Sequence, residues 1–364
     1  MTETSAVLAT VIVVTWNAGK RIESCLRALE DQSLPRAVYR ILVVDNGSAD
    51  ETVEVVLARF PSVSLVRNDK NLGFAGGVAV ALERTETPFA VLVNDDAVVD
   101  RAFLDNILSP MQRPEGELVG AVTAKVLLMP RFAPVTESPD IVVAGHGLRA
   151  LTDTETDPDA VDLVNSTGNE VDRDGNGRDR DWLTIDGGAA DPEVFGFCGA
   201  AAALRMSAVI AAGGLDPTYF LYYEDTDLSW RMRLMGFDIR YEELAVARHW
   251  HSLSSREGSP THRFHHDRNR LLTLLKNAPA PFLTRVLWSY CLTTASVTVR
   301  DLPQTDRTRL HLKVLGSFVW QAPRALRQRR LVKRTAQRPI REVAAAITEV
   351  TPRRDLAYRP RGLG

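Results

Sequence analysis

Asn94, Asp95 and Asp96 follow directly on the apolar run Phe89–Val93. A short run of this kind is typical of a strand that is buried on both faces. Ligands of open α/β sheets bind at the carboxyl ends of the strands, so these three side chains fall where a ligand would lie. Carboxylate oxygens placed there can hold a divalent cation, and the cation can hold a diphosphate. Taken alone, a pair of solvated acids in a turn explains the same residues equally well.

A second acidic group, Glu224 and Asp225, lies at the start of a helix that we predict over Tyr222–Met235. Negative charge is favourable at a helix N-terminus, so capping explains one acid, and we expect Asp227 to be that cap. Adjacent acids beside aromatic residues exceed what a cap needs. A carboxylate within hydrogen-bond reach of a hydroxyl can remove its proton as a general base. One of these two acids is therefore a candidate base.

Histidines follow this predicted helix in two groups. His249 and His251 form an H-x-H pair, although a single histidine is more often structural than a ligand. The stretch 262–266 contains three more, but no cysteine or carboxylate partner completes a zinc site. Arg268 and Arg270 come next, and both an acceptor or phosphate contact and a solvated basic helix explain them.

The N-terminal part of the chain alternates apolar runs with segments of helical periodicity. We predict strands at 9–15, 39–44, 63–66 and 89–93 with helices between them, which is the pattern of a parallel, doubly wound sheet. Polar turns follow three of these strands: Thr15–Asn17, Asp45–Ser48 and Asn94–Asp96. Several such ends in successive units indicate one binding crevice.

The turn Asn71–Gly77 is rich in glycine but is not a G-x-G-x-x-G fingerprint, and no P-loop follows any predicted strand. The pattern therefore gives little support to NAD or ATP binding. Its glycines permit tight packing of a helix on a strand, close approach of the backbone to a ligand, or both.

Six stretches of the chain together resemble a known family: Val11–Asn17, Val44–Thr52, Asn71–Gly77, Leu92–Asp96, Gly196–Arg205 and Tyr222–Arg233. In this order they resemble the inverting glycosyltransferases of family 2, in their rhamnosyltransferase-like branch, over residues 9–275. The resemblance implies an α/β, GT-A fold, which is a Rossmann-like, mostly parallel sheet flanked by helices. It also implies a nucleotide-sugar donor and Mg²⁺ or Mn²⁺ as cofactor.

The resemblance also implies roles for individual residues. Asp225 would be the catalytic base, and Glu224 would orient it or bind the acceptor. Asp96 and His249 would hold the metal. The chain departs from the family's D-x-D motif at Asn94, which replaces an acid, so the metal would rest mainly on Asp96.

The expected contacts with the two substrates follow the same motifs. Asp45 would contact the base of the nucleotide. The nucleotide-sugar contacts are expected at Thr15, Trp16, Asn17, Asp45, Asn46, Ser48, Asn71, Gly73, Phe74, Gly76, Gly77, Asn94 and Asp95. The acceptor contacts are expected at Tyr223, Trp230 and Arg231.

The composition limits the class of protein. A chain of 364 residues with a formal net charge of -2 and 45% hydrophobic residues suits a globular protein, and this charge argues against nucleic acid as the main partner. The three cysteines match no zinc spacing and favour a reducing, cytoplasmic location. The N-terminus lacks the features of a signal peptide. The apolar stretch 286–299 is too short and too rich in Ser and Thr to cross a bilayer.

We expect a glycosyltransferase domain over 1–275 and a helical, basic C-terminal region over 276–364. Within the first, the polar insert 153–191 interrupts the pattern; we expect a solvated surface loop, with an active-site flap as the alternative. Arg324–Arg334 is strongly basic, which fits either a solvated helix or a peripheral contact with the inner face of the cell membrane. A homodimer is compatible with the sequence.

The leading hypothesis is metal-dependent transfer of L-rhamnose from dTDP-rhamnose to a cell-envelope glycan or a lipid-linked acceptor. Galactofuranosyl or other hexosyl transfer from a UDP-sugar is the alternative. A nucleotidyltransferase would carry a glycine-rich basic loop after the first strand, and Thr15–Lys20 lacks one. A non-catalytic sugar-binding protein would not need the pair Glu224 and Asp225.

Overall fold

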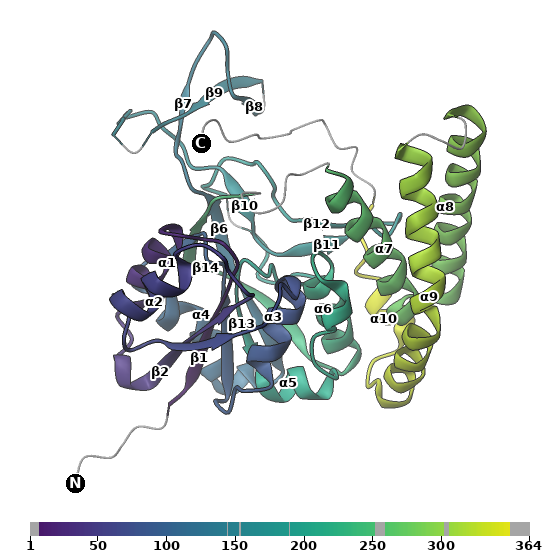
Figure 1. The fold of residues 1–364 in the computed structure, drawn as a ribbon, viewed down its shortest axis with the longest axis horizontal. Helices are drawn as coiled ribbons and strands as arrows, with labels where there is room; N and C mark the ends of the chain where they lie inside the picture. The colour runs from purple at the N-terminus through teal and green to yellow at the C-terminus, as the bar shows by residue number, and fades with distance from the viewer. Residues whose placement is uncertain are drawn as a thin grey trace.

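The computed structural model describes residues 7–143, 145–152, 154–188, 190–251, 259–301 and 306–349 (Figure 1). The N-terminal half alternates strands and helices as the sequence predicts. The elements are β1 (Ala9–Thr15), α1 (Arg21–Glu30), β2 (Tyr39–Asp45), α2 (Thr52–Arg59), β3 (Ser64–Arg67), α3 (Gly73–Leu82), β4 (Phe89–Val93), β5 (Ala97–Val99), α4 (Phe103–Gln112) and β6 (Val119–Leu128). Short 3-10 turns cover Arg36–Val38, Pro114–Gly116 and Pro217–Tyr219.

The C-terminal half supplies the rest of the central sheet and most of the helices. Its elements are β13 (Ala201–Arg205), α5 (Met206–Ala211), α6 (Glu224–Leu234), β14 (Asp238–His249), α7 (Pro260–Asn277), α8 (Ala280–Asp301), α9 (Asp306–Thr335) and α10 (Ile340–Ala344). None of the described helices is long and apolar enough to cross a membrane.

The central sheet has the strand order β3-β2-β1-β4-β13-β6-β14-β5. The first four strands are mutually parallel, which confirms the predicted doubly wound half. β13 then runs antiparallel to both β4 and β6, so the whole sheet is mixed. The α/β fold and the helical C-terminal region are as expected. Within the stretch Gly196–Arg205, only Ala201–Arg205 forms a strand, β13.

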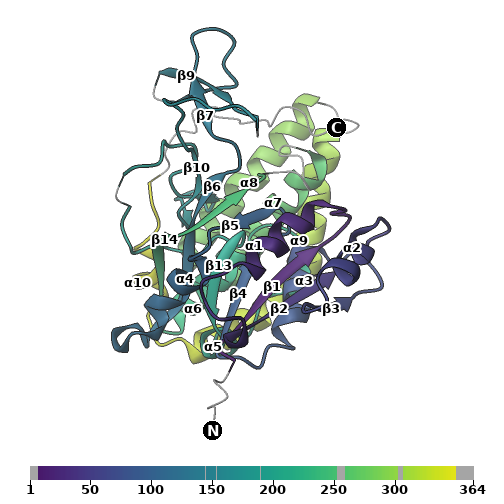
Figure 2. The ribbon, with the colours of Figure 1, turned by 90° about the vertical axis from the view of Figure 1, so that its left-hand side faces the viewer.

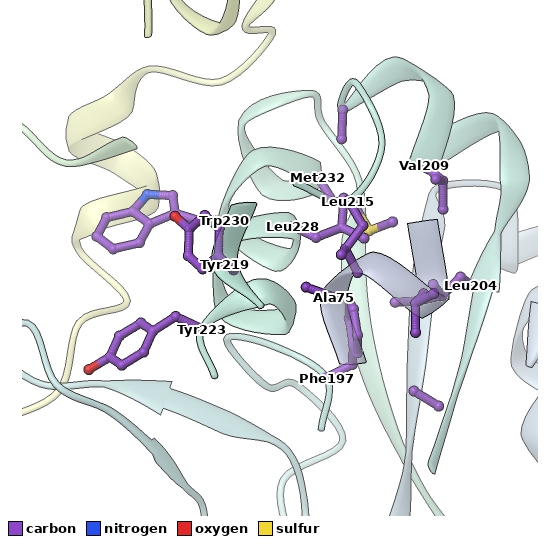
Figure 3. Close-up of a cluster of buried hydrophobic side chains, with 14 of the residues drawn as sticks. Ala75, Phe197, Leu204, Val209, Leu215, Tyr219, Tyr223, Leu228, Trp230 and Met232 are labelled. Atoms are coloured by element: carbon purple, nitrogen blue, oxygen red, sulfur yellow. The ribbon is translucent and has the colours of Figure 1, made fainter. Parts of the chain in front are cut away.

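Helices cover both faces of this sheet because alternate residues of a strand point to opposite faces. In β1, Val11 and Val13 join the core formed with α1, α2 and α4. Ile12 and Val14 join the other core, formed with α3, α5 and α6. Figure 3 shows part of this second core, in which side chains of α3, β13, α5 and α6 meet.

The insert between β6 and β13 is folded rather than a solvated loop. β7 (Phe132–Pro134), β8 (Ile141–Val143) and β9 (His146–Ala150) form a small sheet that projects beyond β6 in Figure 2. β10 (Val164–Ser166) pairs antiparallel with the C-terminal end of β6, which lies between β13 and β14 in the central sheet. β11 (Asn169–Val171) and β12 (Gly177–Asp179) form a hairpin. The buried residues of β10 contradict the expectation of a surface loop over this part of the insert.

The C-terminal helices share a core with the preceding α/β part of the chain. α7 (Pro260–Asn277) crosses the domain boundary that the sequence predicts at residue 275. Val314, Phe318 and Val332 of α9 belong to the same buried cluster as residues of α6. The basic segment is therefore partly structural, and Arg329 donates hydrogen bonds to the carbonyl oxygens of Leu275 and Ala278.

A buried group of charges joins α6, α7 and α9. Asp227 accepts hydrogen bonds from Arg231 at 2.7 Å, from Lys276 at 2.8 Å and from Asn277 at 2.9 Å. Lys276 also reaches Asp216 at 3.1 Å, and Arg324 of α9 reaches Asp216 at 3.1 Å. The expectation that Asp227 caps α6 is wrong, because its carboxylate is fully buried and paired with Arg231 and Lys276.

We expect Lys276→Ala to lower the free energy of unfolding by about 3–5 kcal/mol, because it leaves buried carboxylates without their cation. Urea denaturation of the full chain measures this.

Burial alone would raise the pKa of Asp227, but Arg231 and Lys276 lower it below its ordinary value. The ionised group therefore stabilises the wild type above the unfolded pKa, and that stability is lost as pH falls through the folded pKa.

The matched control is Lys333→Ala, since Lys333 is exposed on α9. Its effect should stay within about 0.5 kcal/mol, as for most surface substitutions. Similar losses in both variants would contradict a stabilising role for the buried charges.

Candidate active site

The carboxyl ends of β1, β2 and β4 meet at one edge of the sheet, as predicted. Thr15 lies opposite Asp45 in the parallel register of β1 and β2. The Thr15 hydroxyl donates to Asp95 Oδ2 at 2.7 Å, which joins the end of β1 to the turn after β4. Three of the expected substrate-binding turns thus lie next to one another.

Two loops brace each other beside this surface. The Asn17 backbone N–H donates to Ser48 Oγ at 2.8 Å, and the Asn17 side chain accepts from the Ala49 N–H at 2.9 Å. Asp45 is fully buried and accepts from the Ser48 N–H. Trp16, the residue before Asn17, is 45% exposed to solvent. A rigid frame with one exposed aromatic ring suits a planar ligand such as a nucleotide base.

The glycines of α3 are explained by packing. Gly73 has a φ of +72°, and a Cβ there would lie 2.2 Å from the Phe220 carbonyl oxygen. A Cβ on Gly77 would lie 2.4 Å from a methyl carbon of Val14, and one on Gly76 would lie 2.6 Å from the Leu72 Cβ. These directions favour the packing explanation over ligand contact.

The polar residues around α3 hold its start. Asn71 Oδ1 accepts from the Gly73 N–H at 2.8 Å, and Asn46 Nδ2 donates to the Gly73 carbonyl at 2.9 Å. Phe74 lies against Gly199, the residue that also contacts Asp225. Asn46 and Asn71 therefore position the α3 turn, and Phe74 lies on the side of the site that faces α6.

Asp96 and His249 meet, although they are far apart in the sequence. β14 pairs antiparallel with β5, and this register places His249 opposite Ala97. His249 Nε2 lies 3.1 Å from Asp96 Oδ1 and 3.3 Å from Asn94 Nδ2. Burial alone would lower the pKa of His249, but the Asp96 carboxylate raises it above its ordinary value.

A third residue orients this histidine. Asn165 of β10 is 2% exposed, and its Oδ1 lies 2.8 Å from His249 Nδ1. An amide oxygen can only accept, so Nδ1 carries the hydrogen and Nε2 keeps its lone pair when the imidazole is neutral. The lone pair then points to the Asp96 side of the site. Nothing in the polar insert indicated this role beforehand, because Asn165 has no characteristic spacing from His249.

The Asn94–Asp96 turn concentrates negative charge. Burial and the neighbouring Asp96 raise the pKa of Asp95 to about 6. Asn94 Oδ1 is buried and has no hydrogen-bond partner. An unpartnered oxygen next to paired carboxylates and an imidazole nitrogen is a donor set that fits Mg²⁺ or Mn²⁺. Within the described residues, no group of three or more His, Cys, Asp or Glu side chains could hold a metal, so the donor diphosphate and water would complete the shell.

Asp225 and Glu224 differ sharply in environment. Asp225 is partly accessible, and its Oδ2 accepts from the Gly199 N–H at 3.1 Å. Burial raises its pKa, while hydrogen bonds from Asn169, Gly199 and Thr226 oppose the rise. Glu224 is buried with Oε2 unpartnered, and burial together with Asp225 raises its pKa to about 8. At neutral pH Glu224 is mostly protonated, which makes Asp225 the better base.

The turn before α6 is strained, and one side chain holds it. Phe220, Tyr222 and Tyr223 all have positive φ, which is costly for aromatic residues and concentrates at functional sites. Asn269 of α7 is fully buried, and its Nδ2 donates to the carbonyl oxygens of Tyr219, Leu221 and Tyr222 at 2.7–3.0 Å. Its neighbours Arg268 and Arg270 were candidates for substrate contact, whereas Asn269 was not.

The expected acceptor contacts at Tyr223, Trp230 and Arg231 are wrong. Trp230 is fully buried and packs edge-on against Phe195, with ring centroids 5.3 Å apart. Figure 3 shows Trp230 and Tyr223 on the side of α6 that faces away from Leu204. Arg231 is paired with Asp227, and the Tyr223 hydroxyl accepts from the Gly177 N–H at 2.9 Å.

The arginines of α7 also have structural partners. Arg268 donates to the carbonyl oxygens of Thr218 and Tyr219, and Arg270 donates to Asn176 Oδ1 at 2.7 Å.

His251, the second histidine of the H-x-H pair, also has a structural environment. Its ring lies obliquely against Trp182, and burial lowers its pKa to about 3. These side chains therefore support the walls of the site.

The insert supplies another acid that the sequence did not indicate. Burial raises the pKa of Asp179 on β12 to about 6, and the charge of Asp225 adds to this effect, while hydrogen bonds with Ser166 and Cys198 oppose it. His249 also acts electrostatically on this carboxyl. Asp179 thus interacts electrostatically with both Asp225 and His249.

Curated relatives of the chain are glycosyltransferases. It is 26% identical over 113 residues to the glycosyltransferase AglE of Haloferax volcanii, a match that covers 30% of this chain and 37% of AglE. It is 31% identical over 97 residues to the poly(ribitol-phosphate) β-N-acetylglucosaminyltransferase TarS of Staphylococcus aureus, which covers 26% of this chain and 17% of TarS. The matches thus span less than half of each relative.

Solved structures share the fold. GalNAc-T7, solved with UDP, GalNAc and Mn²⁺, has a TM-score of 0.57 at 12% identity, over 87% of this chain and 56% of that chain. S. aureus TarS has a TM-score of 0.50 at 16% identity, over 93% of this chain and 53% of that chain. The family model for glycosyl transferase family 2 matches residues 10–210, more than half of the 364 residues. The chain therefore belongs to glycosyltransferase family 2.

Proposed function

We propose that this chain transfers L-rhamnose from dTDP-rhamnose, with inversion, to a hydroxyl of a cell-envelope glycan or a polyprenyl-diphosphate-linked acceptor at the inner face of the cell membrane. The sugar and the acceptor come from the resemblance to the rhamnosyltransferase-like branch. UDP-sugars are the alternative donors, since TarS is an N-acetylglucosaminyltransferase and GalNAc-T7 was solved with UDP.

One arrangement supports a transfer reaction above all. The segment 199–200 connects the two acidic groups: the Ala200 carbonyl accepts from the Asn94 N–H at 3.0 Å, and the Gly199 N–H donates to Asp225. A donor diphosphate held at the Asn94 turn would thus lie next to an acceptor held at Asp225. Inversion needs one base on the acceptor side, opposite the leaving group.

The proposed chemistry is a single displacement. The acceptor hydroxyl oxygen bonds to the anomeric carbon as the bond from that carbon to the diphosphate breaks. The hydroxyl proton passes to the Asp225 carboxylate. A divalent cation held by Asp96 and His249 would neutralise charge on the leaving diphosphate. Asp45 and the Thr15–Asn17 turn are proposed to hold the pyrimidine base, with Asp45 accepting its N3–H.

We expect Asp225→Asn to lower kcat by at least about 10²–10⁴-fold while donor affinity stays nearly unchanged, because the amide cannot accept the proton. Steady-state release of nucleoside diphosphate, together with donor binding by calorimetry, measures both. The wild-type rate should fall as pH falls, since Asp225 must be ionised.

Glu224→Gln is the matched control for this variant. The glutamine copies the protonated form that burial favours for Glu224, so its kcat should fall far less than that of Asp225→Asn. The opposite order would transfer the role of base to Glu224.

We expect Asp96→Ala to abolish turnover and to weaken Mn²⁺ binding in the presence of the nucleoside diphosphate, because it removes a proposed ligand. Calorimetric titration with Mn²⁺ and an activity assay test this. Asp100→Ala, at an exposed site beyond the same turn, should bind the metal normally. Full activity of the wild type in excess EDTA would end the metal hypothesis.

We expect Asn165→Leu to weaken Mn²⁺ binding by about 10–100-fold, as is usual when the partner of a metal-binding histidine is removed. The reason is that the free imidazole can adopt the wrong tautomer or ring orientation. Asn165→Asp, which can still accept from Nδ1–H, should restore most of the affinity. Equal metal affinity in Asn165→Leu and the wild type would refute this role.

A further inference from the structure

α8 and α9 each carry two apolar stripes on opposite sides. In α9, Val314, Phe318, Ala325 and Val332 are buried against the core. Leu312, Val319 and Trp320 lie on the other side and are exposed, with Trp320 81% exposed. A surface helix of a globular protein normally has one apolar stripe, so the second one needs a separate explanation.

The same pattern occurs in α8. Val286, Tyr290 and Val297 are buried, whereas Trp288, Leu292, Ala295 and Val299 are exposed. These exposed residues recur at the i, i+4, i+7 and i+11 spacing of a single helix face. Figure 1 shows α8 and α9 side by side at the flank of the molecule, away from α1 and α2. We call the exposed faces of α8 and α9 together the outer face.

Positive charge accompanies the apolar side chains of the outer face. Arg327, Arg330 and Arg334 are exposed and follow Val319 and Trp320 along the same side of α9. The only acid of α9 is Asp306, in its first turn. Such a concentration of cations is unusual in a chain whose net charge is -2. By contrast, Arg324 and Arg329 have the structural partners described above.

From this combination, we propose that the outer face binds the surface of an anionic lipid bilayer. Exposed Trp and aliphatic side chains beside Arg and Lys are typical of helices that lie in the headgroup region. Anionic headgroups are the complement of Arg327, Arg330 and Arg334. A symmetric contact between two copies of the chain would instead bring these arginines together, which like-charge repulsion disfavours. Only the purpose of this membrane contact, which is access to a lipid-linked acceptor, rests on the proposed function.

The test uses the full chain and vesicles of phosphatidylcholine, with or without phosphatidylglycerol. We expect the protein to sediment with vesicles that contain phosphatidylglycerol and much less with phosphatidylcholine alone. High salt should release it, because screening weakens contacts between exposed charges. Brominated lipids should quench the tryptophan fluorescence of the wild type, since Trp288 and Trp320 would enter the headgroup region.

Paired variants separate the two components of the surface. Trp288→Ser/Trp320→Ser, and separately Arg327→Glu/Arg330→Glu/Arg334→Glu, should each weaken vesicle binding by about tenfold or more. The controls change exposed residues elsewhere: Leu57→Ser/Ile210→Ser for apolar area, and Arg40→Glu/Arg84→Glu for charge. These controls should bind like the wild type. All substituted side chains are exposed, so thermal unfolding should be similar across the set.

Other outcomes would overturn the proposal. The outer face does not bind a bilayer if the wild type ignores both kinds of vesicle and its tryptophans are not quenched. If light scattering also finds a dimer that Trp288→Ser/Trp320→Ser dissociates, the outer face is an interface between copies. Vesicle binding needs neither donor nor acceptor, and donor binding needs no vesicles, so failure here is distinguishable from failure of the proposed transfer reaction.

Discussion

The position of Asp225, the proposed general base, depends on the amide of Asn269. Phe220, Tyr222 and Tyr223, just before α6, adopt positive φ, which is unfavourable for aromatic residues unless the surrounding structure holds them there. The Asn269 amide bonds three carbonyl oxygens of this turn from a buried site on α7. Asp225 lies in the first turn of the helix that follows, so its direction toward Gly199 depends on that arrangement. Buried polar groups of this kind specify one geometry only when every bond is made.

The insert has a comparable role on the other side of the site. β10 joins the central sheet at β6, and this places Asn165 beside His249. β12 carries Asp179, whose carboxyl interacts electrostatically with both Asp225 and His249. The site is therefore built from four separate parts of the chain, namely the β1–β4 turns, the insert, the start of α6 and the end of β14. The family model ends at residue 210, before the last two of these parts.

The sequence predicted what local pattern determines. The apolar runs of β1, β2 and β4 and the polar turns after them are continuous in sequence, so both their strands and their shared edge could be anticipated. The pairing of Asp96 with His249 required the family resemblance, because strand register across distant segments has no local signature. Trp230 and Arg231 were misassigned because helical spacing does not reveal which side of α6 meets the core. The roles of Asn165 and Asn269 depend on tertiary contacts alone.

The sharing of one core by α6 and α9 has a consequence for the modularity of this enzyme. Asp216, just before the strained turn, is bonded both to Lys276 of α7 and to Arg324 and Gln328 of α9. The C-terminal helices are therefore an integral part of the fold and not an independent module that could be removed or transferred to another transferase. Removing them would uncover the apolar side of α6 and release the turn that precedes Asp225, the proposed base. Their inward side is part of the core that supports the start of α6, and only their outward side is left for the proposed contact with lipid.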